Sequence, residues 1–139
     1  MKTTIMLNIP GEPVPQGRPR FHVRNGFVSV YDPPASKKYK QYIAEFAKNH
    51  YSWNPIEGMI VLNCDFYLPI PKSWPKKKQE MARNQEIRPS VKPDWDNYAK
   101  AMCDGLNGVL YKDDGQIVES SIRLLYADEP RAEVEVREV

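Results

Sequence analysis

The sequence is poor in the residues that build zinc sites and disulfide frameworks. Its 139 residues include only two cysteines, Cys64 and Cys103, and two histidines, His22 and His50. Each cysteine stands alone in apolar surroundings, which favours buried free thiols over a disulfide. A structural zinc centre, which usually takes four Cys or His ligands, is therefore not expected.

Long apolar runs are also missing. No run approaches the ~18 residues of a membrane-spanning helix, and the first seven residues lack the apolar core of a signal peptide. We therefore expect a cytoplasmic protein with no membrane partner. A length of 139 residues, with 41% hydrophobic and 27% charged residues, is typical of one globular domain, here residues 1–139.

Charge is unevenly distributed along the chain. The formal net charge is only +2, yet residues 1–91 carry 14 Lys or Arg against 7 Asp or Glu. Residues 92–119 reverse the balance, with 3 against 6. A basic body around an acidic pocket suits a protein that attracts phosphates while holding a cation, although scattered surface charge would give the same totals.

Alternation of apolar and polar residues predicts the strands. The pattern covers residues 3–9, 58–68, 116–126 and 131–139, and Asp128 to Pro130 predicts a hairpin between the last two. Residues 21–31 hold the strongest local signal, because Asn25-Gly26 between two alternating runs is typical of a type I′ hairpin. Residues 11–20 contain three prolines and two glycines, which favours an ordered loop.

Apolar residues that recur at three and four positions predict the helices. The first runs from Asp32 or Ser36 to about Asn49. Its lysines are expected to point outward or to flank the apolar face: Lys37, Lys38, Lys40 and Lys48. A short helix follows Ser73, with Pro75 in its first turn, and a third runs from an Asp94 N-cap to a Gly108 C′ residue. We therefore predict an α+β fold: a single domain with a mixed β-sheet and about three helices packed mainly on one face.

Acidic residues gather around one lysine in the third helix and the turn that follows it. Asp94 and Asp96 open the helix, Lys100 lies one turn further, and Asp113-Asp114-Gly115 forms a tight turn. Carboxylates from two separate segments suit Mg²⁺, which takes a few oxygen ligands and keeps waters that a phosphate can displace. An ordinary solvated helix face with weak ion pairs would show the same spacing. Asp65 is a fourth-choice ligand or a surface residue.

Basic residues precede the acidic segment. Arg18 and Arg20 project from the first loop, and a second cluster surrounds the short helix, comprising Lys72, Lys76, Lys77 and Lys78. Side chains of this kind contact DNA phosphates without reading sequence, so we assign both groups to backbone contacts. The alternative for each is a solvated surface with no partner.

Several of these motifs together resemble one family. Lys92-Pro-Asp-Trp-Asp-Asn97, Asp104-Gly-Leu-Asn-Gly108 and Tyr111-Lys-Asp-Asp-Gly-Gln-Ile-Val118 are similar to the signature of RusA-type Holliday junction endonucleases. The resemblance extends upstream to Pro13-Val-Pro-Gln-Gly-Arg-Pro-Arg20 and Pro71-Lys-Ser-Trp-Pro-Lys-Lys-Lys78. It therefore covers most of the chain in the same order.

The resemblance implies a role for each matched residue. Asp94, Asp96 and Asp114 match the metal-binding aspartates, Lys100 matches the catalytic lysine, and Asp113 matches an acidic neighbour that is not counted as a ligand. Trp95 departs from the usual leucine, and we expect it to lie on the buried side of the helix.

The resemblance also implies an activity. The implied enzyme is a homodimer that cleaves four-way DNA junctions by making paired nicks. It depends on Mg²⁺, for which Mn²⁺ can substitute. Each nick leaves a 5′-phosphate and a 3′-hydroxyl. The family is common in phages and prophages, which suggests a role in recombination and repair.

Two other functions fit the residues. A metal-dependent nuclease for other branched DNA or RNA would keep the same carboxylates and differ only in the shape of its groove. A non-catalytic DNA-binding module would keep the basic clusters, and its acids would serve only as caps and solvated groups.

Overall fold

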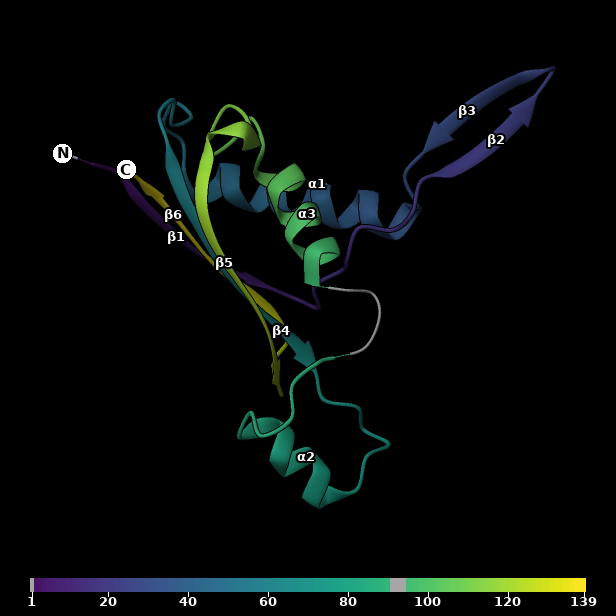
Figure 1. The fold of residues 1–139 in the computed structure, drawn as a ribbon, viewed down its shortest axis with the longest axis vertical. Coiled ribbons are helices and arrows are strands. Elements are labelled where there is room, and N and C mark those ends of the chain that lie inside the picture. Colours follow the sequence, from purple (N-terminus) through teal and green to yellow (C-terminus); the bar gives the residue numbers. More distant parts are fainter. Residues whose placement is uncertain (1, 91–94) are drawn as a thin grey trace.

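The computed structural model describes residues 2–90 and 95–139. Figure 1 shows the fold, and the described residues confirm the predicted α+β class. The elements in order are β1 (Thr4–Pro10), β2 (Arg20–Arg24), β3 (Phe27–Tyr31), α1 (Pro34–His50), β4 (Ile60–Pro69), α2 (Lys76–Arg83), α3 (Trp95–Leu106), the 3-10 helix η1 (Asp114–Gln116), β5 (Ile117–Ala127) and β6 (Arg131–Glu138).

Four of the strands form the main sheet, in the order β1-β6-β4-β5. β4 pairs with β5 in parallel, whereas β6 runs antiparallel to both β1 and β4. The mixed sheet is therefore confirmed. The predicted hairpin at Asp128 to Pro130 is wrong, because β4 lies between β5 and β6. Alternation shows which face of a strand is buried, but it does not show which strand lies beside it.

Helices α1 and α3 cover one face of this sheet (Figure 1). Alternate residues of each strand enter the core there, including Leu7 of β1, Phe66 of β4 and Val136 of β6. The two helices approach closely at Gly105, where an added Cβ would lie 2.8 Å from the Cβ of Ile43. Full burial of a valine, leucine, isoleucine or phenylalanine side chain in this core stabilises the fold by about 1.5–3 kcal/mol.

Prolines precede helices α1 and α2. The N-cap residues are Pro33 and Pro75, and neither position has a side-chain cap. Proline's fixed φ suits the first turn of a helix, so the backbone can start it unaided. Helix α1 therefore begins at Pro34, between the two predicted starts, Asp32 and Ser36, and α2 begins at Lys76, after Ser73.

Ser36 lies inside α1, and its side chain binds the loop that precedes β2. Its buried hydroxyl accepts a hydrogen bond from the Gly17 N–H (2.8 Å) and donates one to the Pro15 carbonyl (3.3 Å). These bonds fasten the loop between β1 and β2 onto α1. The loop is ordered, as its composition predicts.

The third helix places its apolar residues largely as predicted. Tyr98, Met102 and Leu106 are buried, and Gly108 has the positive φ of +79° expected for the C′ position. Trp95 is 58% exposed, so the prediction that it lies on the buried side is wrong. It stands in the first turn, beyond the part of α3 that packs on the sheet. The predicted Asp94 N-cap lies outside the described residues.

The remaining elements extend from the body of the protein. In Figure 1, α2 lies beyond the end of the sheet, and the β2–β3 hairpin extends away on another side. Asn25 and Gly26 both have positive φ, at 52° and 80°, which confirms the type I′ turn. No helix among the described residues is long and apolar enough to cross a membrane.

Candidate active site on α3 and η1

The polar side of α3 carries the residues predicted to act on phosphate. Asp96, Lys100 and Asp104 follow one another at intervals of four, and the Lys100 Nζ lies 3.8 Å from an Asp104 carboxylate oxygen. At 1.5 Å of rise per residue, Asp96 lies about 12 Å from Asp104 along the helix axis. Asp96 and Asp104 therefore lie two turns apart on the same side of α3, and Lys100 lies between them.

A second lysine reaches the same carboxylate from α1. The Lys40 Nζ lies 2.6 Å from Asp32 and 3.7 Å from Asp104. Its side chain is only 17% exposed, so of the two predicted positions, outward or flanking, Lys40 takes the second. The reason is tertiary: α1 and α3 pack together, and the two acids face Lys40 from different segments.

The two lysines of this network, Lys40 and Lys100, differ in their exposure to solvent. Lys40 is half-buried and shared between two carboxylates, whereas the Lys100 side chain is 63% exposed. The hydrogen bond from Lys40 holds the pKa of Asp32 below its usual value. Asp104 thus lies 3.7 Å from the Lys40 ammonium group and 3.8 Å from that of Lys100, and Lys100 is the lysine of the two that faces solvent.

The two aspartates of the acidic turn before β5, Asp113 and Asp114, differ in their contacts. The Asp113 carboxylate accepts a hydrogen bond from the Gly115 N–H (3.0 Å), and the Asp113 N–H donates to the Gln116 side chain (2.8 Å). This pair is a capping box for η1. Gln116 also donates to the carbonyls of Ile56 and Gly58, at 2.8 Å each, which fixes the turn to the body.

Asp114, the neighbouring aspartate, is exposed, and among the described residues its carboxylate has no hydrogen-bond or ion-pair partner. The Tyr111 hydroxyl donates to the Cys103 carbonyl (3.0 Å), which ties the preceding loop to α3. Burial raises the pKa of the Cys103 thiol, and the negative charge of Asp114 raises it further. Asp114 therefore lies close enough to the second half of α3 for its charge to act there.

The predicted metal ligands are Asp94, Asp96 and Asp114. Asp94 lies outside the described residues, and within residues 2–90 and 95–139 no three His, Cys, Asp or Glu side chains are grouped to hold an ion. Asp96 is exposed, like Asp114, and neither forms an ion pair with another described residue. Their free carboxylate oxygens are of the type that Mg²⁺ takes.

The predicted phosphate contacts lie on two sides of α3 (Figure 1). The Gln16 N–H donates to the Asn97 carbonyl (2.8 Å), which brings the loop carrying Arg18 and Arg20 to the first turn of α3. The second cluster is exposed around α2, and comprises Lys72, Lys76, Lys77 and Lys78. Of these, Lys78 lies over the Trp74 ring, 4.1 Å from its centroid.

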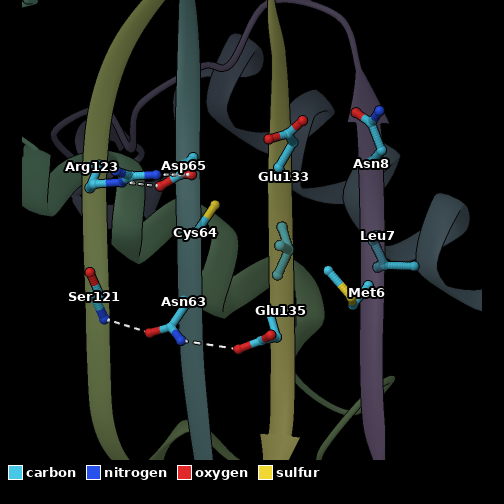
Figure 2. Close-up of a pocket in the computed structure, with 11 residues that line it drawn as sticks. Met6, Leu7, Asn8, Asn63, Cys64, Asp65, Ser121, Arg123, Glu133 and Glu135 are labelled. Carbon is cyan, nitrogen blue, oxygen red and sulfur yellow. Dashed lines mark hydrogen bonds and ion pairs between the residues drawn. The ribbon is translucent and has the colours of Figure 1, made fainter.

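The open face of the sheet holds a separate group of acids, shown in Figure 2. Asp65 forms two hydrogen bonds with Arg123, at 2.7 and 2.6 Å, and Asn63 joins Glu135 (3.1 Å) to the Ser121 backbone (3.0 Å). Because side chains alternate along β4, Asp65 lies on the opposite face from α3. It is a surface residue that cannot join the candidate site.

Sequence reasoning did not find the contribution of Asp32, Lys40 and Asp104. The spacing of four between Lys100 and Asp104 was visible, and it predicts their pairing. No local pattern connects Lys40 with either acid, because these residues come from separate segments.

Comparison with known proteins identifies relatives over nearly the whole chain. A protein-family model described as "Endodeoxyribonuclease RusA" matches residues 10–137. A protein of Bacillus subtilis (strain 168), described as "Uncharacterized protein YqaN", is 46% identical over 137 residues, which cover 97% of this chain and 96% of that protein. The matched region includes all the candidate residues described above.

Proposed function

Because the chain belongs to the RusA family of endodeoxyribonucleases, we propose that it cuts four-way DNA junctions by hydrolysing one phosphodiester in each of two symmetric strands. The observation that carries this proposal is the arrangement on α3 and η1. Two exposed carboxylates, Asp96 and Asp114, have no ion-pair partner among the described residues, and they accompany Lys100, whose side chain is 63% exposed.

The proposed cofactor is Mg²⁺, with Mn²⁺ as a substitute, bound by Asp94, Asp96 and Asp114. The donor set fits, since carboxylate oxygens suit a hard cation and two of the three are free of other partners in the described structure. When bound, the ion would acidify a water and draw charge from a phosphate oxygen. Asp113 is not included in this set, because one of its carboxylate oxygens accepts the Gly115 N–H and caps η1.

Lys100 is the proposed catalytic cation of the chain itself. Asp104 lies one turn beyond it, 3.8 Å from its ammonium group, and also contacts Lys40 at 3.7 Å. Lys100 presents its ammonium group to solvent on the side of α3 that carries Asp96. Such a charge can stabilise the negative charge that grows on a phosphate during attack.

Substrate binding is proposed to rest on backbone contacts and symmetry. The loop that leads to Arg18 and Arg20 contacts the first turn of α3 through Gln16, and the lysines of α2 lie beyond the end of the sheet (Figure 1). These groups can position two duplex arms without reading sequence. Paired nicks in a two-fold junction need two equivalent centres, so we expect a homodimer to be the active form.

The test compares a four-way junction with a linear duplex of the same sequence, in Mg²⁺ and in EDTA. We expect metal-dependent nicking of the junction in two symmetric strands. Equal cutting of the linear duplex would indicate a nuclease of another substrate. Binding without any metal-dependent nicking would indicate a non-catalytic module.

Two variants locate the chemistry. Asp94→Asn should abolish cleavage while junction binding survives or tightens. Lys100→Met should lower the nicking rate by about 10²–10³-fold. Lys112→Met is the matched control, since Lys112 is an exposed lysine that pairs with Glu57. Equal losses in Lys100→Met and Lys112→Met would contradict the assignment of Lys100.

A further inference from the structure

A groove that is open to solvent lies where α3 crosses α1 (Figure 1). It has a volume of about 500 Å³ and runs beside Gly105, the residue at which the two helices approach closely. The charged side chains that line this α1–α3 groove are three lysines and one aspartate: Lys37, Lys40, Lys48 and Asp104. Three positive charges against one negative charge leave the groove with a net charge of +2, which suits an anionic ligand.

The lysines of the groove belong to a stripe along one side of α1. Lys48 follows Lys37 by eleven residues, which is about three helical turns, so both lie on the same side of the helix. Gln41 and Ala44 lie between them and also line the groove. The stripe is about 16 Å long at 1.5 Å of rise per residue. One strand of duplex DNA carries a phosphate about every 3.4 Å of the duplex axis, so the stripe spans about five successive phosphates.

The two outer lysines of the stripe are available to such a ligand. Lys37 and Lys48 are exposed, and neither forms an ion pair with another residue of the described structure. Lys40 is only 17% exposed, and its ammonium group lies 2.6 Å from Asp32 and 3.7 Å from Asp104. Lys40 and its two carboxylates therefore form a paired wall, and the positive charges available to a ligand are those of Lys37 and Lys48.

The groove continues the side of α3 that carries the proposed catalytic lysine. Asp104 lines the groove and lies 3.8 Å from the Lys100 Nζ, and Asn107, which also lines it, follows Asp104 by three residues. A strand with one phosphate at Lys100 can therefore continue along α3 into the groove. The basic residues assigned to DNA in the proposed function lie elsewhere, on the loop before β2 and around α2.

We propose that the α1–α3 groove binds the sugar-phosphate backbone of the DNA strand that flanks the cut, with Lys37 and Lys48 contacting its phosphates. The choice of DNA as the ligand rests on the proposed function, whereas the charge of the groove and its continuity with Lys100 are properties of the chain itself. These contacts carry no sequence information, because an ammonium group binds any phosphate. They fix the direction in which the strand leaves Lys100.

Binding of a four-way junction by the wild type in EDTA tests the groove without any cleavage. Each phosphate that is neutralised adds about 0.9 to the magnitude of the slope of log affinity against log salt concentration. Lys37→Met combined with Lys48→Met should lower that magnitude by about 1.8 for each bound copy of the chain, and should weaken binding at low salt by about tenfold or more. The matched control combines Lys2→Met with Lys112→Met. It removes the same charge from exposed positions outside the groove, and should leave the slope unchanged.

A negative charge added inside the groove separates direct contact from a general loss of positive charge. Gln41→Glu places a carboxylate between the two lysines with almost no change in size, and should weaken binding by about threefold. Asn8→Asp adds the same charge on the open face of the sheet (Figure 2), and should leave binding unchanged. Both side chains are exposed, so both variants should keep the melting temperature of the wild type.

Three results would overturn the proposal: an unchanged salt dependence in the variant without Lys37 and Lys48, an equal change in its matched control, or equal weakening by Gln41→Glu and Asn8→Asp. Failure of the proposed function would look different. Groove-dependent binding by a wild type that makes no metal-dependent nick would contradict the nuclease assignment and leave the groove assignment intact. Normal nicking by a wild type whose groove variants bind as tightly as it does would contradict the groove alone.

Discussion

The two faces of the main sheet both carry acidic residues, but they use them differently. On the open face, Asp65 is held by two hydrogen bonds from Arg123, and Glu135 is bonded to Asn63 (Figure 2). On the helix-covered side, Asp96 and Asp114 are exposed at the edge of the core, without ion-pair partners among the described residues. The acids of the open face are thus already paired, whereas the two proposed ligands keep their carboxylate oxygens free of ion pairs within the described structure.

The largest expected difference between the two faces is seen when one carboxylate charge is removed from each. Asp114→Asn should lower junction nicking by about 10²–10³-fold, because it removes a proposed ligand. Asp65→Asn should change the rate by less than about threefold, since Asp65 is on the other face and its pair with Arg123 is solvated. Rates measured with a labelled junction under single turnover decide the matter. Equal losses would show that the two faces do not differ in function.

The packing of the helix-covered side can be probed at Gly105. Gly105→Ala should destabilise the fold by about 1–3 kcal/mol, because the new Cβ would lie 2.8 Å from the Cβ of Ile43 and the two helices would have to separate. Gly58→Ala is the matched control, with no atom within 4 Å of the added group. Urea unfolding of both variants measures the difference. A stable Gly105→Ala protein would mean that α1 and α3 are less tightly packed than described.

Substitutions of Asp113 test whether its carboxylate caps η1 or binds the metal ion. Asp113→Ala should cost about 1 kcal/mol in local stability of η1, which hydrogen exchange of the turn would detect. Asp113→Asn keeps an oxygen that can accept the Gly115 N–H, so it should retain most of the stability and most of the nicking activity. If Asp113→Asn were as inactive as Asp114→Asn, Asp113 would be a ligand and its capping role secondary.

The smallest expected effect concerns the ion pair between Lys40 of α1 and Asp32, which precedes that helix. The Lys40 hydrogen bond lowers the pKa of Asp32 from its usual 3.8, so the pair's contribution to stability is present above that pH and is lost as the pH falls through the lowered pKa. Lys40→Met should return the pKa of Asp32 toward 3.8, as measured by NMR titration. Lys48→Met, an exposed lysine on the same helix, should leave the pKa of Asp32 unchanged. An unshifted pKa in Lys40→Met would exclude the pairing.

Much of the local structure was predictable from short-range patterns. The Asn25-Gly26 turn, the positive φ at Gly108 and the buried residues of α3 each follow from steric limits or periodicity within a few residues. The family was predictable for a similar reason, since its motifs are contiguous in the chain. The exposed position of Trp95 was not, because the length of α3 that contacts the sheet depends on where α1 and the strands lie.

The sequence by itself therefore determined the elements, their buried faces and the residues available for phosphate chemistry, because these depend on side-chain type and on spacing along the backbone. Only the tertiary structure decided that β4 separates β5 from β6 and that Lys40 turns inward to Asp104. Each of these depends on segments that are distant in the chain but adjacent in space, and no local pattern encodes which of several compatible neighbours a segment will meet.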